Sequence, residues 1–156
     1  MKTIVRGPVT AYGLTGVVFK NITFTHPRED NISADDEALQ HRPALLLVGG
    51  QDITLSRPAY TIEQCLFQCT GAAGLQIFAT SATVLDSEVT TSDSPKSSGG
   101  GLLVSCGGNY SFKRCRFVDN RSCGAYLTSC VATFTDCKFR GNSHHGLHVW
   151  NSAEVH

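Results

Sequence analysis

The feature that most constrains this chain is a seven-residue pattern that recurs about every 22 residues. It reads Ser or Thr, an apolar residue, two polar residues, Cys, any residue and Phe, and its clear copies span residues 61–67, 111–117 and 133–139. Each copy is followed, seven residues after its Phe, by Gly74, Gly124 or Gly146. A unit this short cannot bury its apolar side alone, so the repeat predicts stacked turns of short strands.

Alternation along each strand predicts which side chains face inward. Successive residues of a strand point to opposite faces, so the apolar residue, the Cys and the Phe of one copy share a face. Two weaker copies complete the pattern, one between the clear copies at 61–67 and 111–117 and one nearer the N-terminus. Stacking all five copies predicts three interior ladders: Phe19, Ile62, Val84, Phe112 and Phe134; Ile22, Cys65, Ser87, Cys115 and Cys137; and Phe24, Phe67, Val89, Phe117 and Phe139.

The corners and interruptions of the repeat define the expected domain. Asn120 and Asn142 follow their Phe by three residues and are expected to hydrogen-bond backbone groups at corners. Residues 1–156 form one expected domain, in which the polar stretches 25–43 and 91–100 are inserted corner loops. The spacing of 43 residues between Phe24 and Phe67 fits either two turns or one turn with an insertion.

The repeat from about residue 45 to residue 156 resembles that of right-handed parallel β-helices. These belong to the pectin-lyase-like superfamily and include the carbohydrate-binding and sugar-hydrolase repeat module. The resemblance rests on the copies that read Cys-x-Phe-x-x-Asn-x-x-x-Gly at residues 115–124 and 137–146. It implies an all-β fold, a right-handed parallel β-helix of about five turns. Because no helical cap is visible at residues 1–16 and the chain stops in mid-repeat, we expect a segment of a longer solenoid, with open ends covered by neighbouring turns or protein partners.

The same resemblance implies two classes of function. Polysaccharide lyases, hydrolases and epimerases of this superfamily carry acids and bases on one outer face. Other members, such as certain F-box substrate receptors and SHC-binding, cytokinesis-linked proteins, use the solenoid as a platform without catalysis. Repeated core Cys and the lack of an evident leader look more like the second class. We therefore expect a non-catalytic scaffold or interaction platform, and the alternative is a fragment of a carbohydrate-active or glycan-binding β-helix protein.

The acidic residues do not form the pairs that sugar hydrolysis requires. One carboxyl must protonate the leaving oxygen while a second activates water. Asp35 and Asp36 fall in the acidic insertion, and the outward acids of the repeats are scattered: Glu63, Glu88 and Asp136. The segment 144–146 reads His-His-Gly and lacks the first Gly of the Gly-His-Gly block found in polygalacturonases. The sequence thus predicts no catalytic residue and no cofactor.

Histidines and cysteines suggest packing and not metal binding. His144, His145 and His148 form the densest polar group, but no carboxylate lies near them in sequence and no zinc-type Cys/His spacing occurs. The repeated cysteines Cys65, Cys115 and Cys137 are expected to be buried, reduced and stacked without disulfides. Cys123, at a corner, is the candidate for a reactive thiol.

Outward aromatic residues are the best candidates for contacts with a partner. Trp150, counted from an inward Val149, should point outward beside His148 and Tyr126. Together with His145, these residues are the predicted contact surface, since exposed aromatic rings suit both protein and sugar contacts. Tyr60 and Tyr110 are further candidates for outward aromatic residues, and the alternative for each is partial burial under a loop.

Charge balance, the length of apolar runs and the cysteine count bear on the partner and on the cellular location of this protein. Thirteen basic and thirteen acidic residues balance, which argues against a nucleic-acid partner. No apolar run approaches the ~18 residues of a membrane span. Seven cysteines without an evident leader favour an intracellular, reducing location. Four N-x-S/T sequons keep secretion open if a leader was removed: Asn21, Asn31, Asn109 and Asn120.

Overall fold

The chain folds into three parallel β-sheets that face one another around a common core. The structure is a computed structural model that describes residues 2–26, 42–49, 58–70, 72–93, 100–151 and 153–156. Every regular element in these residues is a β-strand, and each sheet has six strands. No helix in the described residues is long and apolar enough to cross a membrane.

The three sheets are named here A, B and C. Sheet A contains β1 (Thr3–Arg6), β4 (Ile22–His26), β7 (Leu66–Thr70), β10 (Glu88–Asp93), β13 (Arg116–Val118) and β16 (Lys138–Arg140). Sheet B contains β2 (Val9–Tyr12), β5 (Leu45–Val48), β8 (Leu75–Phe78), β11 (Gly100–Ser105), β14 (Cys123–Thr128) and β17 (Leu147–Trp150). Sheet C contains β3 (Val17–Lys20), β6 (Tyr60–Glu63), β9 (Ala82–Leu85), β12 (Asn109–Lys113), β15 (Val131–Thr135) and β18 (Glu154–Val155).

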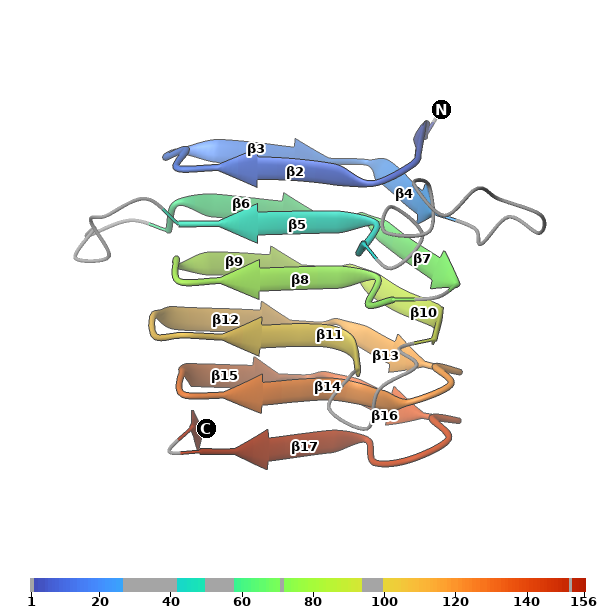
Figure 1. Ribbon diagram of the computed structural model, residues 1–156, viewed down its shortest axis with the longest axis vertical. Helices are drawn as coiled ribbons and strands as arrows, with labels where there is room; N and C mark the ends of the chain where they lie inside the picture. The colour runs from blue at the N-terminus through green and yellow to red at the C-terminus, as the bar shows by residue number, and fades with distance from the viewer. Residues whose placement is uncertain (1, 27–41, 50–57, 71, 94–99, 152) are drawn as a thin grey trace, which may run out of the picture.

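The chain visits sheets B, C and A in the same order in every turn. Each strand pairs in parallel with its counterpart one turn later, so the turns stack along one axis (Figure 1). The five complete turns run from β2 to β16, with β1 before them and β17 and β18 after them. This winding confirms the predicted all-β, parallel β-helix of about five turns.

The pairing of β4 with β7 shows whether the 43 residues between Phe24 and Phe67 form one turn or two. Phe24 of β4 is paired directly with Phe67 of β7, so the 43 residues between them form one turn. Strand β4 continues through His26, and β10 continues through Asp93. The first residues of the expected insertions at 25–43 and 91–100 therefore belong to strands β4 and β10. Gly100, the last residue of the second expected insertion, begins β11. Residues 27–41 and 94–99 lie outside the described part of the chain.

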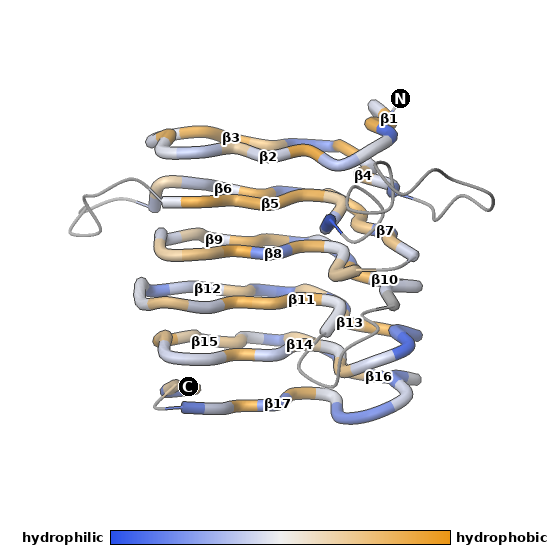
Figure 2. The backbone as a smooth tube through the Cα atoms, viewed as in Figure 1, coloured by the Kyte–Doolittle hydropathy of each residue, from blue (hydrophilic) through white to orange (hydrophobic). Residues whose placement is uncertain are grey.

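The two predicted aromatic ladders are confirmed and form the core. On sheet A, Phe24 stacks on Phe67 at a ring-centroid distance of 5.3 Å, and Phe117 stacks on Phe139 at 4.9 Å. On sheet C, Phe112 stacks on Phe134 at 4.8 Å. These distances match the ~4.8 Å spacing of paired strands. Figure 2 shows apolar segments recurring along the strands of successive turns.

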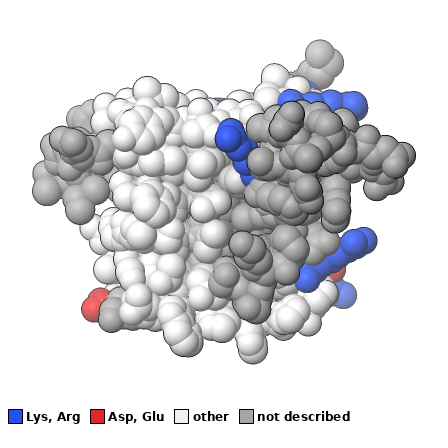
Figure 3. Space-filling model, in the orientation of Figure 1, with Lys and Arg blue, Asp and Glu red and all other residues white. Residues whose placement is uncertain are grey.

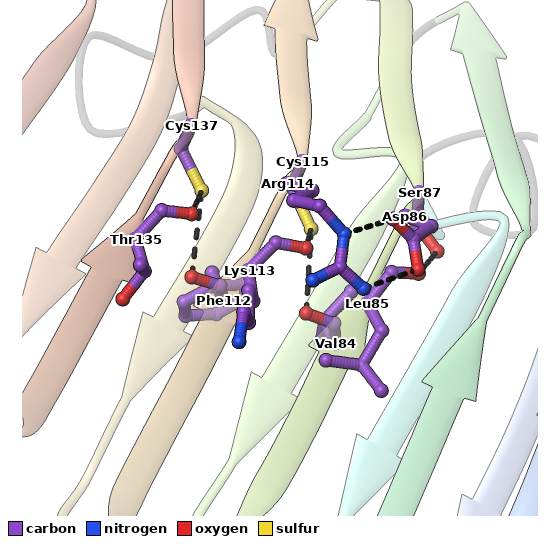
Figure 4. A network of polar contacts seen from close by, with 10 residues as sticks. All are labelled: Val84, Leu85, Asp86, Ser87, Phe112, Lys113, Arg114, Cys115, Thr135 and Cys137. Atoms are coloured by element: carbon purple, nitrogen blue, oxygen red, sulfur yellow. Dashed lines mark hydrogen bonds and ion pairs between the residues drawn. The ribbon is translucent and has the colours of Figure 1, made fainter.

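The third ladder, of Cys and Ser, lies at the corner between sheets C and A. The Cys115 thiol donates to the carbonyl of Lys113 at 3.5 Å and to that of Val84, in the preceding turn, at 3.4 Å (Figure 4). Cys137 repeats the arrangement one turn later, and the Ser87 hydroxyl donates to the Leu85 carbonyl at 2.7 Å. A small side chain with one donor therefore fits this corner, which explains why Ser can replace Cys in the repeat.

Asparagines organise the corner between sheets A and B as predicted. The Asn142 amide donates to the Phe117 carbonyl at 2.9 Å, and the Asn120 amide donates to the Val89 carbonyl at 3.2 Å. The two amides are also joined to each other, at 2.9 Å. A Cβ on Gly124 would lie 2.6 Å from the Gly146 carbonyl oxygen and 2.7 Å from the Asn142 side chain, so the neighbouring turn requires glycine at this point.

Tyr60 and Tyr110 are buried, so of the two alternatives the outward orientation is wrong. Both point into the core two residues before Ile62 and Phe112, so they share the inward face of sheet C. Their hydroxyls still find partners, because they reach carbonyls at the corner between sheets B and C. Tyr60 donates to Val48 at 3.1 Å and Tyr110 donates to Gly107 at 2.7 Å.

Burial of Tyr110 and Cys69 predicts a loss of stability at alkaline pH. Burial raises the pKa of Tyr110 from 10.0 to about 12 and that of Cys69 from 9.0 to about 11. Both groups hold their protons more tightly in the folded chain. Their contribution is therefore complete below pH 9 and is lost as pH rises toward 12, at about 2 kcal/mol for each group.

Urea unfolding measured from pH 8 to pH 12 checks this expectation. Tyr110→Phe should flatten the decline between pH 10 and pH 12, because the titrating hydroxyl is gone. A free energy of unfolding that stays constant across this range in the parent protein would contradict the assignment.

Candidate functional site

Acidic side chains on sheets A and C are held in ion pairs that run between neighbouring turns. Glu63 pairs with Lys20 at 3.0 Å, and Glu88 pairs with Arg116 at 3.4 Å. At the corner between these sheets, the Arg114 guanidinium donates two hydrogen bonds to one carboxylate, that of Asp86. These hydrogen bonds lower the pKa of Asp86. The arrangement matches cations to carboxylates across turns and brings none of these acids together in a carboxyl pair.

The outer face of sheet B has a different character. Its side chains form two columns that run the length of the solenoid, and none of them is Asp, Glu, Lys or Arg. One column is Thr10, Leu46, Gln76, Leu103, Tyr126 and His148, and the other is Tyr12, Val48, Phe78, Ser105, Thr128 and Trp150. Sheet B lies toward the viewer in Figure 3, and the part of this face not covered by grey atoms is almost entirely white.

The four predicted contact residues come together at the C-terminal end of this face. Tyr126 lies on β14, His148 and Trp150 lie on β17, and His145 lies in the corner that precedes β17. His148 is central: its ring centroid is 4.9 Å from that of Tyr126, 5.2 Å from that of His145 and 6.5 Å from that of Trp150. We call these four residues the aromatic cluster.

Strand geometry fixes the cluster while leaving it open to solvent. Tyr126 and His148 are paired residues of adjacent parallel strands, so their rings lie one above the other. Both are half-buried, whereas His145 is exposed and Trp150 is 61% exposed. Three of the four side chains therefore start from paired strands, so their backbone is already ordered before a partner binds.

Two residues of this face were missed by the sequence analysis. Tyr12 and Phe78 lie in the same outward column as Trp150 and are 71% and 39% exposed. Alternation on either side of inward Ala11 and Ile77 carries the signal that would have found them.

The remaining candidates lie apart from the cluster or are buried. His156 lies near Glu154 on sheet C, at 3.9 Å, and His144 is exposed beside His145. Among the described residues, no group of three His, Cys, Asp or Glu side chains could hold a metal ion. The prediction that Cys123 is an accessible thiol is wrong, because it is 3% exposed at the start of β14, whereas Cys106 is exposed.

Comparison with known families agrees with the winding of the chain. The family model described as right-handed β-helix region matches residues 9–156. The chain belongs to this right-handed β-helix family. The match gives the hand of the β-helix and covers all five complete turns, including the aromatic cluster. Neither the curated proteins nor the solved structures provide a significant match. Membership establishes architecture, and since one fold serves many functions, function has to be argued from the surface.

Proposed function

We propose that this β-helix is a non-catalytic interaction platform that binds a protein partner through the outer face of sheet B. The observation that carries the proposal is the aromatic cluster, in which Tyr126, His145 and Trp150 surround His148 on a face whose two columns contain no Asp, Glu, Lys or Arg. Aromatic residues that combine apolar area with a polar atom dominate the binding energy of many protein interfaces.

The shape and charge of this face support binding. Parallel strands hold its two columns at regular spacing, so a partner meets a preformed surface. Desolvating an uncharged face costs less free energy than desolvating the ion-paired faces of sheets A and C. Tyr12 and Phe78 extend the apolar area toward the N-terminal turns.

The state of the carboxylates supports a role without catalysis. A sugar hydrolase needs one carboxyl with a raised pKa as the acid and a second nearby as base or nucleophile. The pKa of Asp86 is instead lowered by hydrogen bonds from Arg114, and Glu63 and Glu88 each face a cation. These groups stabilise neighbouring turns against each other.

A glycan-binding β-helix is the second candidate. Exposed Tyr12 and Trp150 lie in one outward column, at opposite ends of sheet B, and their ring faces could stack on sugar rings. A glycan ligand would bind the same face, and a set of acidic and neutral polysaccharides separates it from a protein partner.

Trp150→Ala is expected to weaken partner binding at least 30-fold, because an anchor of this kind contributes about 2 kcal/mol. Its thermal midpoint should match that of the parent protein, since the side chain is 61% exposed. Val18→Ala is the matched control, because Val18 is equally exposed but lies on sheet C.

For Trp150→Ala and Val18→Ala in parallel, quantitative co-purification from source cells would measure the binding of protein partners. The polysaccharide set would measure the binding of glycans. Loss of one protein with Trp150→Ala alone supports the platform. Loss of a bound polysaccharide supports the glycan-binding alternative. Cleavage of a polysaccharide that requires Glu63, Asp86 or Glu88 would overturn the non-catalytic assignment.

A further inference from the structure

The corner ladder between sheets C and A places two thiols in consecutive turns. Cys115 immediately precedes β13 and Cys137 immediately precedes β16, and these two strands are paired in register. The Cys115 carbonyl accepts a hydrogen bond from the Lys138 amide at 2.9 Å. Figure 4 shows Cys137, Cys115 and Ser87 at the same bend of three successive turns.

The pair is close enough for a covalent bond. Paired strands lie ~4.8 Å apart, within the range of Cα separations that disulfides span. The Cys115 thiol lies 3.5 Å from the Lys113 carbonyl oxygen and the Cys137 thiol lies 3.4 Å from the Phe112 carbonyl oxygen, so the two thiols contact neighbouring residues of β12. Cys65 occupies the same ladder, but Ser87 stands between it and Cys115. A separation of two strand spacings, ~10 Å, excludes Cys65 from a disulfide with Cys115.

The two thiols differ in exposure and in acidity. Cys115 is 2% exposed, whereas Cys137, in the last complete turn, is half-buried. The interaction between the two neighbouring side chains lowers the pKa of Cys137 and, together with burial, raises the pKa of Cys115. Thiolates and not thiols attack peroxides, so the more accessible thiol is also the more reactive one.

We propose that Cys115 and Cys137 form a dithiol that hydrogen peroxide converts into a disulfide between consecutive turns. In the first step the Cys137 thiolate attacks one peroxide oxygen, the O–O bond breaks, and sulfenic acid and hydroxide form. The hydroxide takes up a proton and leaves as water.

The second step joins the turns. The Cys115 sulfur attacks the Cys137 sulfur, the S–O bond breaks, and the oxygen leaves as a second water with the Cys115 proton. Two thiols are oxidised, and one peroxide is reduced to two waters. The bond ties β13 to β16 at the corner and does not depend on the role proposed for sheet B.

Titration with hydrogen peroxide, followed by thiol counting and peptide mapping, tests this assignment. A Cys106→Ser background removes the exposed thiol, which would otherwise react with peroxide or with a second chain. In that background the thiol count should fall by two, and the intact mass should fall by about 2 Da as two hydrogens leave. Mapping should find one peptide pair, joined through Cys115 and Cys137.

Serine variants identify the pair, because Ser87 shows that serine fits the ladder with its hydrogen bond to the residue two positions earlier. Cys115→Ser and Cys137→Ser should each abolish the joined peptides, while Cys65→Ser should leave them unchanged. Circular dichroism confirms that each variant is folded. The assignment is overturned if Cys137 proceeds to sulfinic acid while Cys115 stays free to alkylate, if peroxide leaves both thiols unchanged, or if a different pair is joined.

Discussion

Gly108→Ala is expected to lower the free energy of unfolding by at least about 3 kcal/mol. Gly108 has a φ of 90°, where an L-residue is strained. A Cβ at this position would overlap the Thr80 carbonyl of the preceding turn and approach the Tyr110 hydroxyl at 2.9 Å. Because the obstructing atoms include backbone of the preceding turn, relief requires two turns to move apart.

Gly107→Ala provides the matched control for this substitution. Gly107 also has a positive φ, of 77°, but a Cβ there would meet nothing within 4 Å. Its expected cost is the backbone strain alone, about 1 kcal/mol. Urea unfolding of both variants isolates the effect of close stacking, and equal losses would show that Gly108 and Thr80 of the preceding turn are not packed as described.

Phe117→Ala is expected to cost about 3–5 kcal/mol, the range for removing a large aromatic side chain from a core. Phe117 is 1% exposed and stacks on Phe139 at 4.9 Å. Its edge contacts reach Phe112 and Phe134, each with ring centroids at 6.0 Å. Truncation leaves a cavity bordered by these rings and by Val89 of the neighbouring turn.

Phe139→Ala should cost less, about half as much, because Phe139 belongs to the same ladder but is half-buried in the last complete turn. Chemical denaturation compares the two variants. A loss for Phe139→Ala that equals or exceeds the loss for Phe117→Ala would contradict the described gradient of burial along the ladder.

The ladders could be predicted from sequence because two independent regularities agree. Alternation fixes which residues of a strand face inward, and the repeat fixes which residues stack. The same reasoning placed Tyr126, His148 and Trp150 on one outer face. It did not place Tyr60 and Tyr110 in the core, where carbonyls at the corner between sheets B and C accept their hydroxyl protons.

Other features depend on geometry that the sequence pattern does not encode. Strand β10 extends through Asp93 past a register shift after Thr90, so the apolar pattern ends before the pairing does. The ion pair between Asp86 and Arg114 joins residues 28 positions apart, and only the stacking of turns with an insertion between them brings the two together.

Binding through the outer face of sheet B is tested most directly by site-specific photocrosslinking in source cells. A photoreactive benzoyl-phenylalanine replaces either Tyr126, on β14, or Thr133, on the next strand β15 of the same turn. The two probes differ in the sheet they occupy, since Tyr126 faces outward on sheet B and Thr133 faces outward on sheet C. We predict one defined crosslinked product from position 126 that Trp150→Ala removes, and none from position 133. Crosslinking from position 133 alone, or equally from both positions, would contradict the proposed contact surface.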